Sequence, residues 1–240
     1  MAFNQDQVRK ARAAGLIVVL VAVIVLAVAV FSGALGTPKA GSSQQDAAGS
    51  ETAQSTEAQS GAQSDSSSSS DHTVADVDAE NQPVVEQLET RYEDDPSNPT
   101  ALLNLANGYF DWGVAVMNHA QTDEDDDHVV DLFSRAIAHY DDYLEQYGSE
   151  NGANKAVQVD RAISIFYTGD HERAIQTLED FTAEVADFGP AWANLGMFYE
   201  NDGRTDDARA AYERALEADD DNAYGVRDYA EARLEALDAE

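Results

Sequence analysis

Cysteine is absent from this chain of 240 residues. Without a thiol, the chain forms no disulfide, no thiolate metal site and no cysteine nucleophile, and it offers no cysteine for lipidation. The phosphate-binding loop, the glycine motif of dinucleotide-binding folds and the nucleophile elbow are also missing from the sequence. Because no motif brings an acid, a base and a nucleophile together, we expect a protein that is not an enzyme, with no catalytic residue, no cofactor and no metal site.

Positive charge is scarce. The 14 lysine and arginine residues face 46 aspartate and glutamate residues, which gives a formal net charge of −32. The imbalance is concentrated after Ala79, where 38 acidic residues face 10 basic ones. Such a field repels nucleic acid and anionic lipid and attracts basic surfaces. We therefore expect no nucleic acid partner, and protein partners with basic or apolar segments. Adaptation to high salt is a second explanation of the acidity, which the sequence leaves open.

One long hydrophobic run, GLIVVLVAVIVLAVAVFSGAL at residues 15 to 35, contains no charge. As a helix it spans roughly 31 Å, about the thickness of a bilayer core. Three basic residues precede it, so the positive-inside rule places residues 1 to 14 in the cytoplasm. We expect a single-pass cell-membrane protein whose C-terminal domain is extracytoplasmic. The alternative is a cleaved signal peptide with its cleavage site at residues 32 to 34, although the run exceeds the roughly 7 to 15 apolar residues of such peptides.

Residues 36 to 78 are built from serine, glutamine, alanine, glycine, threonine and acids, and they contain almost no large apolar residue. This composition cannot bury a core and predicts a disordered linker. A flexible chain of this length reaches roughly 35 to 40 Å. The linker would therefore hold the domain predicted for residues 79 to 240 near the membrane surface.

After the linker, the sequence has helical periodicity and no segment that alternates like a strand, so we expect an all-α domain. Residues 189 to 222 carry a spaced set of aromatic and small residues: Trp192, Leu195, Gly196, Tyr199, Gly203, Ala208 and Tyr212. This set resembles the signature of the tetratricopeptide repeat, in which two short antiparallel helices approach through small residues. The resemblance implies a solenoid of antiparallel helix pairs, with about three repeats and flanking helices.

Two weaker copies of the pattern precede residues 189 to 222. Their matching residues are Ala162, Gly169 and Ala174 in residues 155 to 188, and Leu105, Ala106, Tyr109 and Ala136 in residues 99 to 150. In the earlier copy the second-helix residues arrive 18 residues late, so we expect an extended first helix and an exposed acidic loop at residues 121 to 127. A helix at residues 83 to 93 precedes the repeats, and a C-terminal capping helix at residues 222 to 238 follows them.

The resemblance also implies a partner site. In tetratricopeptide domains, the first helix of each repeat lines a concave groove that binds segments of other proteins. The positions of this chain that correspond to the groove are Leu103, Asn107, Phe110, Asp111, Val159, Ile163, Phe166, Tyr167, Ala193, Met197, Glu200 and Asn201.

Two further motifs have simpler interpretations. The acidic run from Asp123 to Asp127 offers carboxylate oxygens to a cation, but it lacks the glycine and the final acid of an EF-hand loop. We interpret it as a solvated acidic surface and leave cation binding open. His171 and Glu172 begin like a zinc-protease helix without its second histidine, which indicates the start of an ordinary repeat helix.

These patterns together predict a non-catalytic scaffold or adaptor that is tethered to the membrane and binds protein segments in its groove. A chaperone or assembly factor for exported proteins has the same predicted fold and remains the alternative. The two differ in their partners, because an adaptor holds one partner firmly whereas a chaperone binds many clients weakly. The sequence identifies neither the partner nor the oligomeric state.

Overall fold

The computed structural model describes residues 72–148 and 154–239. These residues form eight α-helices and no strand: α2 (Val74–Asp94), α3 (Pro99–His119), α4 (Asp123–Tyr147), α5 (Asn154–Tyr167), α6 (His171–Glu184), α7 (Gly189–Asn201), α8 (Thr205–Ala218) and α9 (Arg227–Asp238). The all-α prediction is thus confirmed for this part of the chain. None of these helices is both long and apolar enough to cross a membrane. The run at residues 15 to 35 and most of the predicted linker lie outside the described residues.

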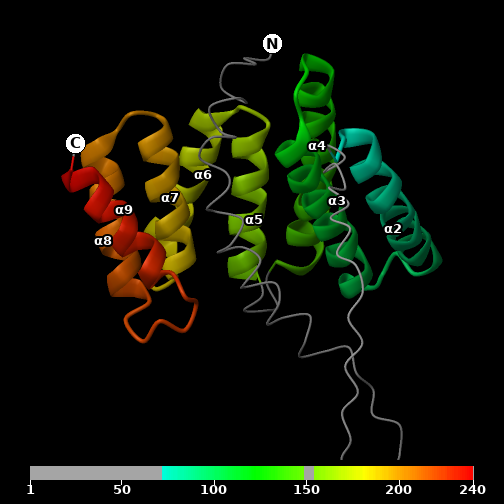
Figure 1. The fold of residues 1–240 in the computed structure, drawn as a ribbon. Coiled ribbons are helices and arrows are strands. Elements are labelled where there is room, and N and C mark those ends of the chain that lie inside the picture. The colour runs from blue at the N-terminus through cyan, green and yellow to red at the C-terminus, as the bar shows by residue number, and fades with distance from the viewer. Residues whose placement is uncertain (1–71, 149–153, 240) are drawn as a thin grey trace, which may run out of the picture.

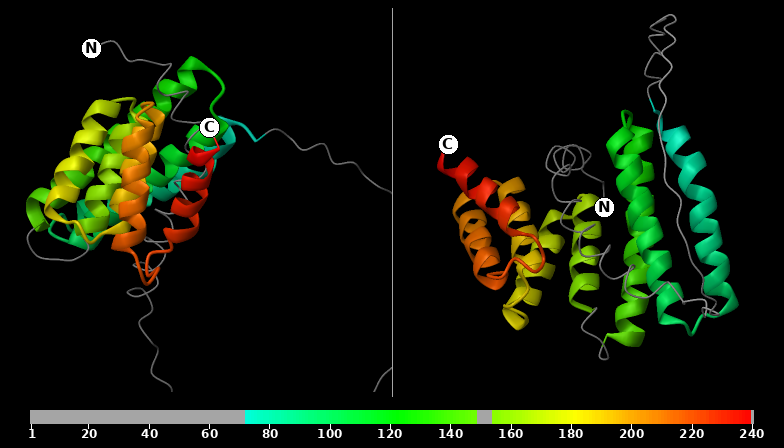
Figure 2. Two further views of the ribbon diagram at one scale, coloured as in Figure 1. Left: turned by 90° about the vertical axis from the view of Figure 1, so that its left-hand side faces the viewer. Right: turned by 60° about the horizontal axis from the view of Figure 1, so that its bottom comes forward.

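The helices stand side by side in chain order, and α2 and α9 lie at opposite ends of the row (Figure 1 and Figure 2). Each helix contacts the next along the chain, and α5 also contacts α7. A single core runs through the array. Most of the signature residues lie in this core, namely Leu105, Ala106, Tyr109, Ala136, Ala162, Ala174, Leu195, Gly196, Tyr199, Ala208 and Tyr212, and Trp192 is partly buried beside it.

The pair of α7 and α8 shows why its signature residues are needed. Gly203 has φ of 78°, a left-handed conformation that glycine adopts without strain, and it reverses the chain between the two helices. Gly196 lies so close to Tyr212 that a Cβ atom there would be 2.7 Å from the ring. Gly169, between α5 and α6, has φ of 85° and makes the same kind of turn.

We expect the Gly196→Ala variant to lose roughly 1–3 kcal/mol of unfolding free energy, because the new methyl group meets a rigid, buried ring. Gly108→Ala is the matched control. Its Cβ would meet a terminal methyl group of Leu88, which can rotate away, so the better helix propensity of alanine should leave stability unchanged or raised. Urea unfolding followed by circular dichroism measures both. Equal effects of the two substitutions would contradict the close approach of α7 and α8.

The extra residues of the first repeat lengthen both of its helices. α3 has 21 residues and α4 has 25, whereas α7 has 13 and α8 has 14. The predicted extension of the first helix is correct, but the predicted acidic loop is wrong. Thr122 and Asp125 form a capping box, so the run from Asp123 becomes the first turn of α4. Carboxylates are favoured there because the N-terminus of a helix carries partial positive charge.

α2 begins nine residues earlier than the predicted start at residue 83. Thr73 and Asp76 form a capping box, which starts the helix inside the range that was predicted to be linker, and Pro83 lies within the helix. α2 occupies the place of a repeat's second helix. The Tyr109 hydroxyl donates a hydrogen bond to Glu89 on α2, just as the Tyr199 hydroxyl donates to Glu179 on α6 at 2.7 Å.

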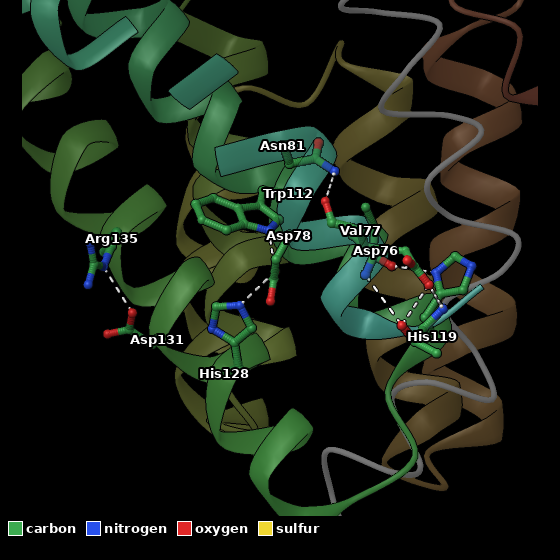
Figure 3. Close-up of polar contacts among 11 residues, drawn as sticks. Asp76, Val77, Asp78, Asn81, Trp112, His119, His128, Asp131 and Arg135 are labelled. Carbon is green, nitrogen blue, oxygen red and sulfur yellow. Dashed lines mark hydrogen bonds and ion pairs between the residues drawn. The ribbon is translucent and has the colours of Figure 1, made fainter. Parts of the chain in front are cut away.

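Asp78 fastens the N-terminal part of α2 to the extensions of α3 and α4 (Figure 3). Its Oδ1 accepts a hydrogen bond from the Trp112 indole N–H at 2.8 Å and lies 3.0 Å from His128 Nε2. The nearby pair of Asp131 and Arg135, at 2.9 Å, is more than half exposed and adds little stability. The contact of α2 with the longer hairpin therefore depends on one carboxylate.

We expect Asp78→Ala to destabilise the docked α2 by roughly 1–2 kcal/mol, since it leaves the indole N–H of the buried Trp112 without its acceptor. Hydrogen exchange read by mass spectrometry should show faster exchange in α2 and little change in α7 and α8. Glu93→Ala, which removes an exposed carboxylate from the same helix, is the control. Unchanged exchange in α2 of Asp78→Ala would show that the helix is held by other contacts.

α9 starts five residues later than the predicted capping helix. Asn222 has φ of 56° and Gly225 has φ of 71°, so the chain turns twice before it becomes helical. The buried Asp219 carboxylate accepts hydrogen bonds from the backbone N–H groups of Tyr224 and Val226 and holds this turn in place. The sequence contains no helix stop that would have revealed it.

Candidate functional site

The structure separates the twelve predicted groove residues into two groups. Seven are at most 4% exposed and belong to the core: Phe110, Val159, Ile163, Phe166, Tyr167, Ala193 and Met197. Their neighbours are other helices of the array. The Phe166 ring, for example, stacks on Phe198 with a centroid distance of 4.4 Å. Side chains that are covered in this way offer no surface to a partner, so five groove candidates remain.

Two of these five lie at the α9 end of the array. Glu200 forms an ion pair with Arg233 of α9 and accepts a hydrogen bond from the Tyr212 hydroxyl at 2.9 Å. The Asn201 side chain also has an interaction partner. The capping helix therefore already satisfies Glu200. Leu103, Asn107 and Asp111 remain, all on α3.

A pocket of about 340 Å³ lies beside these α3 residues, between α2 and α3. It is lined by Asn81, Val84, Val85, Leu88, Asn104, Asn107, Gly108 and Asp111. Val84 is 54% exposed, which is unusual for a large apolar side chain in the described part of this chain. The wall from α2 is mainly apolar, and the wall from α3 carries two amides and a carboxylate. Only Asn107 and Asp111 among these were predicted from the sequence.

Asn107 is held in position by α4. The hydroxyl of the buried Tyr140 donates a hydrogen bond to Asn107 Oδ1 at 2.8 Å. No described residue bonds to the side chain of Asn104. An asparagine side chain contains one acceptor and two donor hydrogens. The two amides therefore offer the pocket the same kinds of groups that an extended backbone needs as partners.

Asp111 stands in a hollow of the protein. Its side chain is exposed to water, yet burial raises the pKa of its carboxyl to about 6. Both are consistent with a side chain at the mouth of a pocket, which water reaches from one side only. Asp160 on α5 is 5% exposed, and burial, with a smaller effect of the Asp111 charge, raises its pKa to about 8. Asp160 was not predicted as a site residue.

The remaining sequence motifs form no separate site. Among the described residues, no group of three or more histidine, aspartate or glutamate side chains is arranged to hold a metal ion. In the acidic run, Asp126 is buried and has an interaction partner. His171 begins α6, as predicted, and its ring stacks on Phe166 with a centroid distance of 4.3 Å.

Sequence reasoning missed the α2 wall because a helix equivalent to a repeat's second helix was not recognised before the first repeat. It missed Asp160 because the resemblance assigns groove positions only at fixed steps along α5. One signal was available. Asp160 is an acid between Val159 and the apolar residues of the following turn, which is unusual in a helix that is buried on most sides.

Part of the chain matches a known protein family. Residues 189–222 match the family model described as tetratricopeptide repeat. Among solved structures, a thermophilic TPR protein of Thermus thermophilus is 18% identical, with 70% of this chain and 93% of that chain covered and a TM-score of 0.44. MamA of Desulfovibrio magneticus RS-1 is 15% identical, with 68% and 92% covered and a TM-score of 0.35.

No curated protein matches the sequence. The family match covers α7 and α8, the pair in which Gly196 and Gly203 occupy the close approach and the turn. The chain therefore carries a tetratricopeptide repeat at residues 189–222, within an all-α array of antiparallel helices.

Proposed function

We propose that this chain is a non-catalytic adaptor that binds a segment of another protein in the pocket between α2 and α3 and along the adjoining face of α3. The pocket carries the proposal, because it combines exposed apolar surface with unbonded amide groups. Its volume lies within the range of small ligand sites and suits one or two side chains of a peptide. An apolar wall supplies affinity, and amides fix the register of an extended backbone.

The adaptor is tethered to the membrane. Residues 15 to 35 provide the apolar run, and the basic residues before it favour an extracytoplasmic position for the helical domain. Residues 36 to 71 leave the domain free to meet partners within several tens of ångströms of the bilayer. Tethering at this distance raises the effective concentration of a membrane-bound partner, which is the advantage of an anchored adaptor over a diffusing one.

Photocrosslinking in living cells tests this function. A photocrosslinking amino acid at Val84 should join the full-length chain to one dominant protein, because this side chain is exposed on the pocket wall. The same residue at Glu213, exposed on α8, is the control and should give no matching adduct. Removal of residues 15 to 35 should weaken the adduct.

The pattern of adducts also separates the adaptor from the chaperone. A broad smear of exported proteins at Val84 would favour a chaperone that uses the same pocket. The same adducts at Val84 and Glu213 would show random contact. Absence of any adduct at Val84 and at Leu103 would contradict binding on the α2–α3 face.

A further inference from the structure

Two carboxylates of the array lack a partner. Within the described residues, neither Asp111 on α3 nor Asp160 on α5 accepts a hydrogen bond or forms an ion pair through its carboxylate. Asp160 is only 5% exposed, and a buried charge is normally paired or hydrogen-bonded. Asp219, which is also buried, follows that rule and accepts two backbone hydrogen bonds. Asp160 is the exception that needs an explanation.

Both carboxylates belong to the same region of the groove. Asp111 lines the pocket between α2 and α3, and it lies near enough to Asp160 for its charge to raise the pKa of that residue. The Tyr140 hydroxyl feels both carboxylates, and it donates its hydrogen bond to Asn107, another pocket residue. Asp160 thus faces the α3 side that carries the pocket.

The surroundings of the two carboxylates define what fits there. Val84, Val85 and Leu88 form an apolar wall on α2, and the acids lie across from it on α3 and α5. A ligand that satisfies both sides has an aliphatic stem and a cationic end, which is the chemistry of lysine and arginine. The described residues near the acids provide no third carboxylate or histidine for a metal ion. The chain's net charge of −32 also draws basic segments toward this surface.

We propose that the pocket receives a lysine or arginine side chain of the bound protein segment, with its stem on Val84 and Leu88 and its cationic group against Asp111 and Asp160. This inference rests on the proposed function and makes it specific. The partner segment must contain a basic residue at one fixed position, and its other positions are freer. The cation supplies the partner that the buried Asp160 carboxylate lacks within the chain.

Peptide selection on the full-length protein tests this inference. Twelve-residue peptides are selected from a random phage-displayed library, and the tightest is synthesised with a fluorescent label. Each basic residue is then replaced in turn, lysine by norleucine and arginine by citrulline, and fluorescence anisotropy gives the dissociation constants. On the unaltered protein, one replacement should weaken binding at least about tenfold, which is the effect of a charged hydrogen-bonded contact.

The variants identify the contact. On Asp160→Asn and on Asp111→Asn, the same replacement should weaken binding by less than about twofold, because the carboxylate that it needs is gone. Glu213→Gln removes an equal charge from α8 and should keep the full tenfold effect. Circular dichroism verifies folding. Asp111 is exposed, so its variant keeps the test valid even if the variant at the buried Asp160 does not fold.

The other outcomes each contradict the inference in a different way. Peptides that bind to this face without a basic residue would leave the proposed function intact and overturn the cation pocket. A tenfold effect that persists in both variants would place the basic contact elsewhere. Titration with Mg²⁺ alone that shows binding lost in both variants, with no effect of either on the peptide, would assign the acids to a metal ion. Failure to select any peptide would contradict the proposed function as well.

Discussion

Replacement of Phe166 by alanine should lower the free energy of unfolding by roughly 3–5 kcal/mol, the usual cost of removing a buried phenylalanine ring. The ring is fully buried and is stacked between Phe198 and His171, with centroid distances of 4.4 and 4.3 Å. It therefore joins α5 to α6 and α7 at the centre of the array. Urea unfolding of the full-length chain measures the loss.

Leu103→Ala is the control for this experiment. Leu103 is only partly buried on α3, so its truncation should cost less than about 1 kcal/mol. If Phe166→Ala fails to fold, the milder Phe166→Leu should still fold with reduced stability. A Phe166→Ala protein of unchanged stability that no longer binds its partner would place Phe166 in the groove, as the sequence predicted, and would contradict the core assignment.

Asp160→Asn should raise stability in alkaline solution, by on the order of 3 kcal/mol at pH 9. The pKa of Asp160 is about 8 in the folded chain, against 3.8 for an exposed aspartate. Because the folded pKa is the higher one, the folded state holds the proton more tightly than the unfolded state does. The charged form is therefore costly to fold, and unfolding free energy falls as pH rises from about 4 to about 8.

The pH dependence of the difference provides the sign of the effect. At pH 5 Asp160 is protonated in the folded state and resembles asparagine, so variant and parent should differ much less than at pH 9. Asp111 on α3 and the Tyr140 hydroxyl on α4 are the titratable groups that interact with it. Asp219→Asn should have the opposite sign, because its two oxygens each accept a backbone N–H. A destabilised Asp160→Asn protein at pH 9 would show that Asp160 has a favourable partner.

The fold was largely predictable from the last repeat. Trp192, Gly196, Gly203 and Tyr212 mark one helix pair at a recognised spacing, and the same spacing applied toward the N-terminus locates the others. The helix ends were less predictable, since they depend on caps. Thr73 and Thr122 each begin a helix with a capping box, and both helices were expected to start elsewhere. Short polar motifs of this kind occur by chance in acidic segments, which hides them.

The site was less predictable than the fold. Family positions placed Asn107 and Asp111 at the pocket, but they also selected Phe110, Phe166 and Met197, which the structure buries. Position within a repeat determines the direction of a side chain but not what covers it. In this chain, neighbouring helices cover most of α5 and α7. The opening remains on α3, where the longer α2 leaves a hollow beside Val84.

Hydrogen exchange of the full-length chain with and without a saturating captured segment tests protein binding at the α2–α3 face most directly. The segment should slow exchange at residues 81 to 88 and 104 to 111, which line the pocket on the two helices. Residues 205 to 218 of α8 should exchange at the same rate in both samples. Protection confined to α8, or to any surface other than α2, α3 and α5, would contradict the proposed site.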